Sequence, residues 1–236
     1  MTTFELYAPD PASRLLPAAT AERIAESLRR GGLAVLPTET GHLLAAAATL
    51  PAAVRRAFVA KGRDLANPMH VACSTVAMAT DYAVLTPRAR HLLEAYTPGP
   101  LSVVVPARSG RLPDGYVTLH GTVGIRIPEP PATRQVIEAL GQPVTATSLN
   151  RSGEETRPVD RALLESLDWP AVGTVYALVE NAAVVHQAAS TLVRITGPEV
   201  EVLRPGPVPE ASVRATLADC PPGPAADPRQ AAPAAR

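Results

Sequence analysis

The sequence predicts an α/β or α+β fold in which helices flank a mixed sheet. Segments with the β-rich composition of buried strands alternate with segments of helical spacing along most of the 236 residues. Hydrophobic residues make up 46% of the chain, which supplies enough apolar material for a buried core. Polar turns follow several strand-like segments, and α/β proteins collect ligand-binding groups at such strand ends.

The expected helices begin and end at residues that commonly cap or break helices. Thr20 is placed to cap the first helix, which the Gly31-Gly32 pair stops. Pro51 suits the first turn of the second helix, which leads directly to Lys61. We expect helices at residues 20–30, 51–61, 87–97, 131–140, 163–167 and 213–217.

Short runs rich in β-branched residues lie between these helices. We expect strands at residues 33–36, 69–73, 101–105, 123–127, 144–147, 175–179, 191–195 and 200–203. Residues 1–217 would form one domain, and residues 218–236 form a Pro/Ala-rich tail. That tail has too little apolar surface to order itself, so we expect it to be disordered.

The composition excludes several classes of protein. The 22 basic and 22 acidic residues give a formal net charge of zero, which argues against binding nucleic acid through bulk charge. Apolar runs are too short to span a bilayer, and the N-terminus lacks the pattern of a signal peptide, so we expect a cytoplasmic protein without a membrane partner. The two cysteines are far apart, and Cys73 is expected to be a small buried apolar residue.

Lys61 is the only lysine in the chain, although the chain holds 22 lysines and arginines together. An ammonium group is a compact point charge, whereas a guanidinium is a planar fork, so the two are not interchangeable where geometry matters. Lys61 lies in Lys61-Gly62-Arg63, between a helix and a loop. This placement favours a functional role, and we expect Lys61 to face a solvated cavity.

Common nucleotide-binding and catalytic motifs are absent from the sequence. It contains no GxxxxGK[ST] loop, no GxGxxG loop, no HExxH and no GxSxG. The five histidines lack the spacing of metal ligands, so no protein metal site is expected. A nucleotide site would therefore have to be assembled from scattered turns.

Polar turns that could form such a site occur in a definite order. Each has an ordinary alternative explanation, because Thr38 could cap a helix, Ser148 could close a turn and Arg126 could be a solvated strand residue. The ordered set is Gly31-Gly32, Pro37-Thr38-Glu39-Thr40, Lys61-Gly62-Arg63, Asn67-Pro68, Pro98-Gly99-Pro100-Leu101-Ser102, Arg126-Ile127-Pro128, Ser148-Leu149-Asn150-Arg151-Ser152-Gly153, Ser190-Thr191 and Leu203-Arg204-Pro205-Gly206.

This ordered set resembles the pattern of the threonylcarbamoyl-AMP synthase (YrdC-like) family, over residues 18–217. The resemblance implies a twisted mixed sheet with flanking helices around a deep basic cavity. It also implies an enzyme, a nucleotidyltransferase that forms threonylcarbamoyl-AMP and pyrophosphate from L-threonine, bicarbonate or CO2, and ATP. The product would pass to a downstream transferase that modifies adenosine in tRNA, and Mg²⁺ would accompany the triphosphate.

The resemblance also assigns roles to individual residues. The catalytic set would be Lys61, Arg63, Ser148 and Asn150, with Asn150 supporting the turn at Ser148. ATP would be held by Lys61, Arg63, Asn67, Thr122, Ser148, Thr156 and Arg204. Threonine would be held by Thr40, Arg126, the backbone of Ala146, and Ser190; the planar fork of Arg126 suits a carboxylate.

The chain departs from the family pattern near the amino-acid side of the expected site. His42 stands where the family usually has a tyrosine, and Ala72 stands where it has a histidine. His70 lies two residues before Ala72 and would point to the same side of a strand, so it could compensate. Residues 185–189 replace a segment that is usually glycine-rich and acidic.

Two other interpretations remain open. One is a divergent relative that forms a carbamoyl-adenylate on another amine, or a carbamoyl transferase. The other is a non-catalytic member that binds RNA, including double-stranded RNA, weakly in the same cavity. The zero net charge and the 3% aromatic content count against the second interpretation.

Overall fold

The computed structural model describes residues 2–64, 66–149, 157–166, 169–170, 173–218 and 220. The helices are α1 (Ala18–Arg29), α2 (Pro51–Lys61), α3 (Val76–Ala79), α4 (Pro87–Tyr96), α5 (Pro131–Leu140), α6 (Arg161–Glu165), the 3-10 turn η1 (Asn181–Ala183) and α7 (Glu210–Ala218). The strands are β1 (Thr3–Tyr7), β2 (Ala34–Thr38), β3 (Gly41–Ala45), β4 (His70–Ala72), β5 (Leu101–Pro106), β6 (Thr118–Leu119), β7 (Thr122–Arg126), β8 (Val144–Ser148), β9 (Thr174–Leu178), β10 (Thr191–Arg194) and β11 (Glu201–Arg204).

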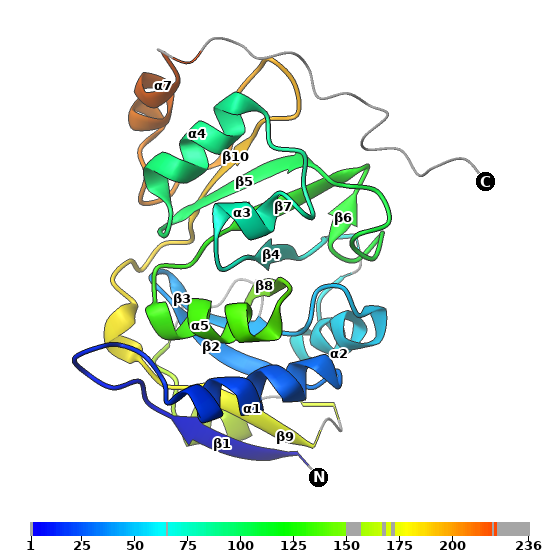
Figure 1. The fold of residues 1–236 in the computed structure, drawn as a ribbon, viewed down its shortest axis with the longest axis vertical. Coiled ribbons are helices and arrows are strands. Elements are labelled where there is room, and N and C mark those ends of the chain that lie inside the picture. The colour runs from blue at the N-terminus through cyan, green and yellow to red at the C-terminus, as the bar shows by residue number, and fades with distance from the viewer. Residues whose placement is uncertain are drawn as a thin grey trace.

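These strands form one mixed sheet, in agreement with the predicted fold class. Its order is β1-β9-β2-β3-β8-β4-β7-β5-β10-β11, with β6 paired to β7 (Figure 1). β2 runs antiparallel to β3 and parallel to β9, while β5 runs antiparallel to β7 and parallel to β10. β8 pairs with both β3 and β4, and so joins the two halves of the sheet.

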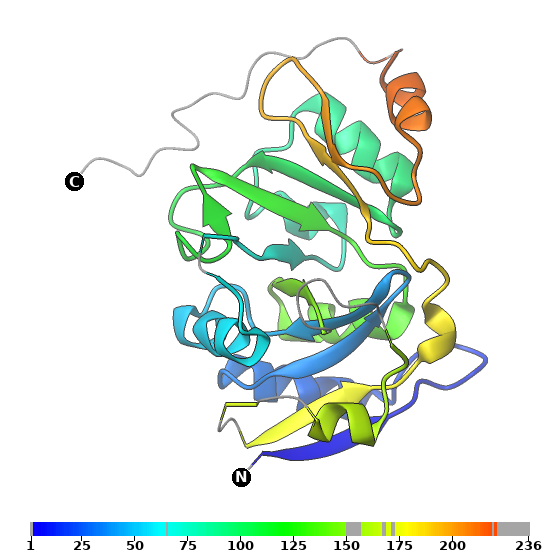
Figure 2. The ribbon, with the colours of Figure 1, turned by 180° about the vertical axis from the view of Figure 1, so that it is seen from behind.

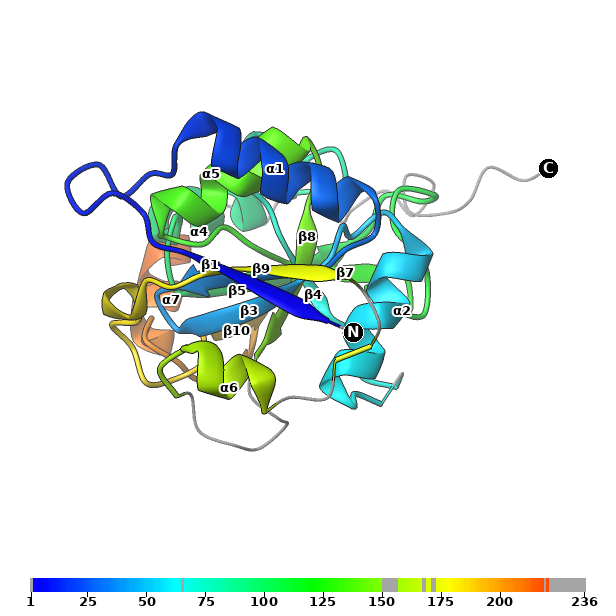
Figure 3. The same ribbon diagram turned by 90° about the horizontal axis from the view of Figure 1, so that it is seen from below.

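Helices cover both faces of the sheet. α1 and α5 pack on one another over one face, and α6 lies on the opposite face, as the view along the sheet edge shows (Figure 3). The apolar core is correspondingly divided in two. Leu28, Leu36 and Ile137 belong to the cluster under α1 and α5, whereas Val54 and Phe58 belong to the larger cluster that contains α2.

Several predicted helix ends are confirmed, but α6 (Arg161–Glu165) and α7 (Glu210–Ala218) begin earlier than the expected helices at 163–167 and 213–217. α2 begins at Pro51 and ends at Gly62, whose φ of 60° is in the left-handed region that glycine tolerates. α5 ends in the same way at Gly141. The predicted cap at Thr20 is wrong, because α1 already begins at Ala18 after Pro17, and no side chain caps it.

Three strands were not expected from the sequence, namely β1, β3 and the two-residue strand β6. β1 pairs in parallel with β9 at the edge of the sheet, and β3 forms a hairpin with β2. β3 is buried along its whole length, so it lacks the polar alternation that identifies a half-exposed strand. The alanine-rich sequence that follows it also favours no strand.

Among the residues described, no helix has the length and apolar character needed to cross a membrane. This finding agrees with the absence of a long apolar run in the sequence.

The two valines of α2 provide a test of the core. Val54 is fully buried, whereas Val59 on the same helix is 62% exposed. We expect Val54→Ala to lower the free energy of unfolding by about 2 kcal/mol, because it removes buried methyl groups and leaves a cavity. Val59→Ala, the matched control, should change it by less than about 0.5 kcal/mol in urea unfolding. Equal losses at the two positions would contradict this packing of α2.

Candidate active site

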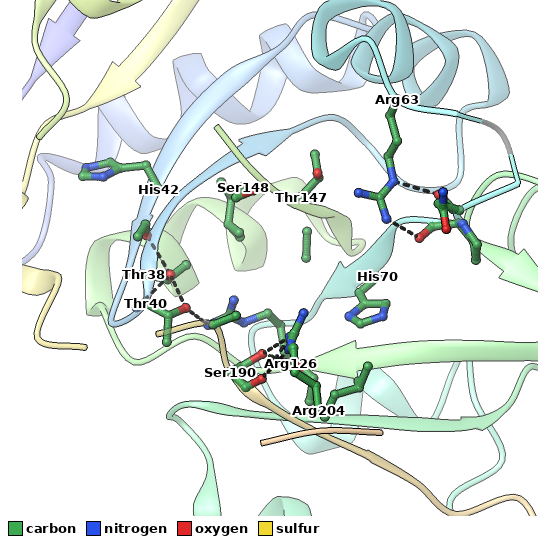
Figure 4. A pocket seen from close by; sticks show the side chains of 18 of the residues that line it. Thr38, Thr40, His42, Arg63, His70, Arg126, Thr147, Ser148, Ser190 and Arg204 are labelled. Atoms are coloured by element: carbon green, nitrogen blue, oxygen red, sulfur yellow. Dashed lines mark hydrogen bonds between the residues drawn. The ribbon is translucent and has the colours of Figure 1, made fainter. Parts of the chain in front are cut away.

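A cavity of about 530 Å³ opens where the β2–β3 hairpin faces strands β4, β7, β5 and β10 (Figure 4). The described residues that line it include four arginines and no carboxylate. They are Thr38, Thr40, Gly41, His42, Leu43, Arg63, Asn67, Pro68, His70, Ser102, Arg126, Ala146, Thr147, Ser148, Ala189, Ser190, Leu192, Arg194 and Arg204. Such a lining attracts anions.

Two of these arginines are held in place by backbone carbonyl groups. Arg63 follows the end of α2 and donates to the carbonyls of Asn67 (2.7 Å) and Pro68 (3.1 Å). Arg204, the last residue of β11, donates to the carbonyl of Ser190 at 3.1 and 2.9 Å. Burial lowers the pKa of both guanidinium groups, and the charge of Arg126 lowers that of Arg204 further. Both sites would therefore gain from a bound anion.

Lys61 is the last residue of α2, and it is buried next to the cavity. Only 8% of the residue is exposed, so the expectation that it faces a solvated cavity is wrong. Its Nζ donates to Ser148 Oγ at 3.3 Å, and Ser148 lines the cavity at the end of β8. The ammonium group is therefore joined to the cavity through the Ser148 hydroxyl group.

Arg126 takes part in a buried ion pair that the sequence did not predict. Its Nη2 lies 2.5 Å from Glu39 Oε1, and the two side chains are only 8% and 2% exposed. The same Nη2 donates to Thr40 Oγ1 at 3.2 Å. The other oxygen of Glu39, Oε2, accepts a hydrogen bond from the backbone N–H of Glu129 at 2.9 Å. Glu39 thus fixes the guanidinium group at the wall of the cavity.

Serine and threonine hydroxyl groups complete the lower part of the cavity. Ser190 is buried before β10, and its Oγ lies 2.8 Å from Ser102 Oγ on β5. Thr38 donates to the carbonyl of Gly41 at 2.7 Å, which closes the β2–β3 hairpin and presents Thr40 to the cavity. The chain reaches Ser190 from η1 through a segment that runs along the edge of the molecule (Figure 2).

Comparison with known proteins identifies the family. Residues 26–206 match the family model of Sua5, YciO and YrdC proteins, which carries the description Telomere recombination. The chain is 33% identical over 211 residues to a putative threonylcarbamoyl-AMP synthase of Mycobacterium tuberculosis, covering 87% of this chain and 90% of that one. The protein belongs to the Sua5/YciO/YrdC family.

Other members of the family are longer than this chain. It is 27% identical to the threonylcarbamoyl-AMP synthase of Bacillus subtilis over 80% of its own length and spans 54% of that protein. The crystal structure of Pyrococcus abyssi Sua5 complexed with L-threonine superposes with a TM-score of 0.77 at 24% identity. That match covers 93% of this chain and 62% of the other, and it establishes the shared fold.

The structure brings most of the residues singled out by the family resemblance to one place. Arg63, Asn67, Ser148, Arg204, Thr40, Arg126, Ala146 and Ser190 all line the cavity, and Lys61 contacts it through Ser148. Thr122 is not among the lining residues, and its hydroxyl group donates to the carbonyl of Leu119 at 2.8 Å. Asn150 and Thr156 lie outside the described residues. The roles of all these residues in binding remain predictions.

The structure shows the surroundings of His42 and Ala72, which depart from the family pattern, and of His70. His42 is 3% exposed, and neither ring nitrogen makes a hydrogen bond within the described part of the chain. Burial lowers the pKa of His42 to about 4, so its ring is neutral at physiological pH. Ala72 is completely buried, whereas His70 lines the cavity.

Glu39, Ser102 and Thr147 are cavity or wall residues to which the family resemblance assigned no role. Glu39 is adjacent to the expected Thr40 and could have been identified by its motif, but its partner Arg126 is 87 residues away. Thr147 is buried beside the cavity, and its hydroxyl group finds no partner among the described residues. The contacts of Glu39 with Arg126 and of Ser102 with Ser190 join residues far apart in the sequence, so they become visible only once the strands are paired in the structure.

No group of three or more His, Cys, Asp or Glu side chains suited to a metal occurs in the described part of the chain. Cys73 is fully buried, as expected, and burial raises the pKa of its thiol to about 12. The buried, protonated thiol of Cys73 is therefore unsuited to act as a nucleophile.

Breaking the ion pair between Glu39 and Arg126 should strongly lower the stability of the protein. We expect Glu39→Gln to lower the free energy of unfolding by about 3–5 kcal/mol, because the change leaves a buried guanidinium group without its counter-charge. The matched control is Glu201→Gln, which breaks the exposed pair between Arg194 and Glu201 and should cost about 1 kcal/mol or less. Urea unfolding of both variants measures the difference, and equal losses would contradict the structural importance of the buried pair.

Proposed function

We propose that the protein is an L-threonylcarbamoyladenylate synthase, which forms threonylcarbamoyl-AMP and pyrophosphate from L-threonine, bicarbonate or CO2, and ATP. Relatives that align with 80% and 81% of the chain carry the name threonylcarbamoyl-AMP synthase. The observation that carries the proposal is the cavity itself. It gathers Arg63, Arg204, Ser148, Thr40 and Arg126 in one lining, so it offers groups for an anion and for an amino acid.

The phosphates of ATP would lie among the cations near the end of α2. Arg63 and Arg204 line the cavity with their guanidinium groups already oriented, and Lys61 adds charge through its contact with Ser148. Oriented donors stabilise the charge that develops during phosphoryl chemistry without reorganising. Mg²⁺ would enter with the triphosphate, held mainly by phosphate oxygens.

The amino acid would lie beside the β2–β3 hairpin. Arg126 donates to Glu39 and Thr40 through Nη2, so other donors of its planar fork are left for a carboxylate. Thr40, Ser190 and the backbone of Ala146 line the same part of the cavity and would meet the hydroxyl and amino groups of threonine. In the crystal structure named above, the related Sua5 of P. abyssi is complexed with L-threonine.

The proposed reaction consists of two steps. The amine of threonine combines with bicarbonate or CO2 to form a carbamate. A carbamate oxygen then forms a bond to the α-phosphorus of ATP while the bond from that phosphorus to the pyrophosphate oxygen breaks. Such a displacement depends on alignment and charge neutralisation rather than on a covalent enzyme intermediate. The product would serve a transferase that modifies tRNA.

The purified protein should be incubated with MgATP, bicarbonate and each amino acid in turn, while pyrophosphate is measured. The proposal expects release that requires both threonine and bicarbonate. Release with another amine would instead indicate a divergent member that forms a different carbamoyl-adenylate. Absence of release with every amine, accompanied by salt-sensitive RNA binding, would favour a binding protein and overturn the proposal.

Lys61 tests the phosphate part of the proposal. We expect Lys61→Ala and Lys61→Met to lower kcat by about 100- to 1000-fold, because each removes a charge positioned near the developing phosphate charge. Lys61→Met keeps the buried apolar stem, so the loss should not depend on unfolding. Arg55→Ala, an exposed change on the same helix, should retain full activity. Wild-type turnover in both Lys61 variants would rule out this role.

A further inference from the structure

The imidazole ring of His70 stands at the centre of the cavity. Its strand, β4, places it directly beside Ala146 of β8 in the sheet register. Figure 4 shows the ring between Arg63 on one side and the pair Arg126 and Arg204 on the other. His70 therefore lies between Arg63, which is proposed to contact the phosphates, and Arg126, which is proposed to contact the amino acid.

The ring of His70 lies close over Gly124 on β7. A Cβ atom added at Gly124 would lie 2.5 Å from His70 Cδ2, 2.7 Å from Cγ and 3.0 Å from Nε2. These distances are shorter than van der Waals contact, so any side chain at position 124 would have to displace the imidazole. The absence of a side chain on Gly124 is thus what allows the ring to occupy the cavity floor.

His70 differs chemically from the cations around it. Burial lowers its pKa to about 4, and the charges of Arg204, Arg63 and Arg126 act in the same direction. The ring is therefore neutral at physiological pH, with one nitrogen that carries a lone pair. Guanidinium groups can only donate hydrogen bonds, so His70 supplies an acceptor in the midst of donors.

We propose that His70 accepts a hydrogen bond from the nitrogen of the amino-acid substrate and so orients the carbamate towards the α-phosphorus. This inference rests on the proposed function. The carbamate formed on a primary amine keeps one N–H, and its neighbours would be Arg126 and Ala146 on the amino-acid side. Arg63 and Arg204, which line the same cavity, would hold the phosphates. A neutral acceptor among these cations satisfies that N–H without attracting the phosphates.

A series of variants at position 70 tests this role. His70→Leu removes the acceptor at similar volume, whereas His70→Asn and His70→Gln place an amide oxygen near the positions of Nδ1 and Nε2, respectively. We expect His70→Leu to lower kcat/KM for threonine by about 10- to 100-fold, the effect of losing one such hydrogen bond. At least one amide variant should remain within about fivefold of wild type. The KM for ATP should change by less than about threefold.

Gly124→Ala provides an independent route to the same effect. It leaves His70 in the chain but pushes its ring from the cavity floor, so it should lower kcat/KM for threonine in the same way. The double variant Gly124→Ala with His70→Leu should be no worse than the more severe single variant, because both remove one interaction. Melting temperatures of all variants serve as the control for folding.

The outcomes separate this inference from the proposed function. A wild-type protein that releases no pyrophosphate with threonine overturns both. An active wild type with a folded His70→Leu variant of unchanged kcat/KM for threonine overturns the role of His70 alone. A loss confined to the KM for ATP also overturns it, because the ring would then serve the phosphates. If His70→Leu fails to fold, equal threonine kinetics of wild type and the Gly124→Ala variant would likewise overturn the role of His70.

Discussion

The ion pair between Glu39 and Arg126 is the interaction on which the cavity depends. It joins the β2–β3 hairpin to β7, two elements that are not neighbours in the sheet. Removing both charges from water is costly, and here the cost is offset by further contacts to Thr40 and to the backbone of Glu129. Together with the hydrogen bond to Thr40, the ion pair holds Arg126 against the hairpin and sets the direction of its guanidinium group.

The same pair explains how a chain without net charge can hold a strongly basic cavity. Acidic residues balance the arginines over the whole sequence, but the described lining of the cavity contains none. Glu39 forms an ion pair with Arg126 but is not among the described residues that line the cavity. The guanidinium groups of Arg63 and Arg204 are oriented by backbone carbonyls, which carry no net charge. The field inside the cavity is therefore positive and geometrically fixed.

The sequence predicts those parts of the fold that are determined locally. Pro51 and Gly141 mark helix ends because their backbone preferences act within a few residues. The cavity residues could be grouped only because their motifs follow the order known for a family. The partner of Glu39, the buried state of Lys61 and the contact between His70 and Gly124 could not be predicted, because each depends on how distant strands pair.

The connection that leads to Ser190 is attached to Glu39 by backbone hydrogen bonds. The carbonyl of Glu39 accepts hydrogen bonds from the N–H groups of Val185 (3.1 Å) and His186 (2.9 Å). Every residue except proline carries such a donor, so this attachment places almost no demand on side-chain identity. The segment 185–189 is thus free to diverge during evolution while still delivering Ser190 to the cavity, and its unusual composition here is compatible with an intact site.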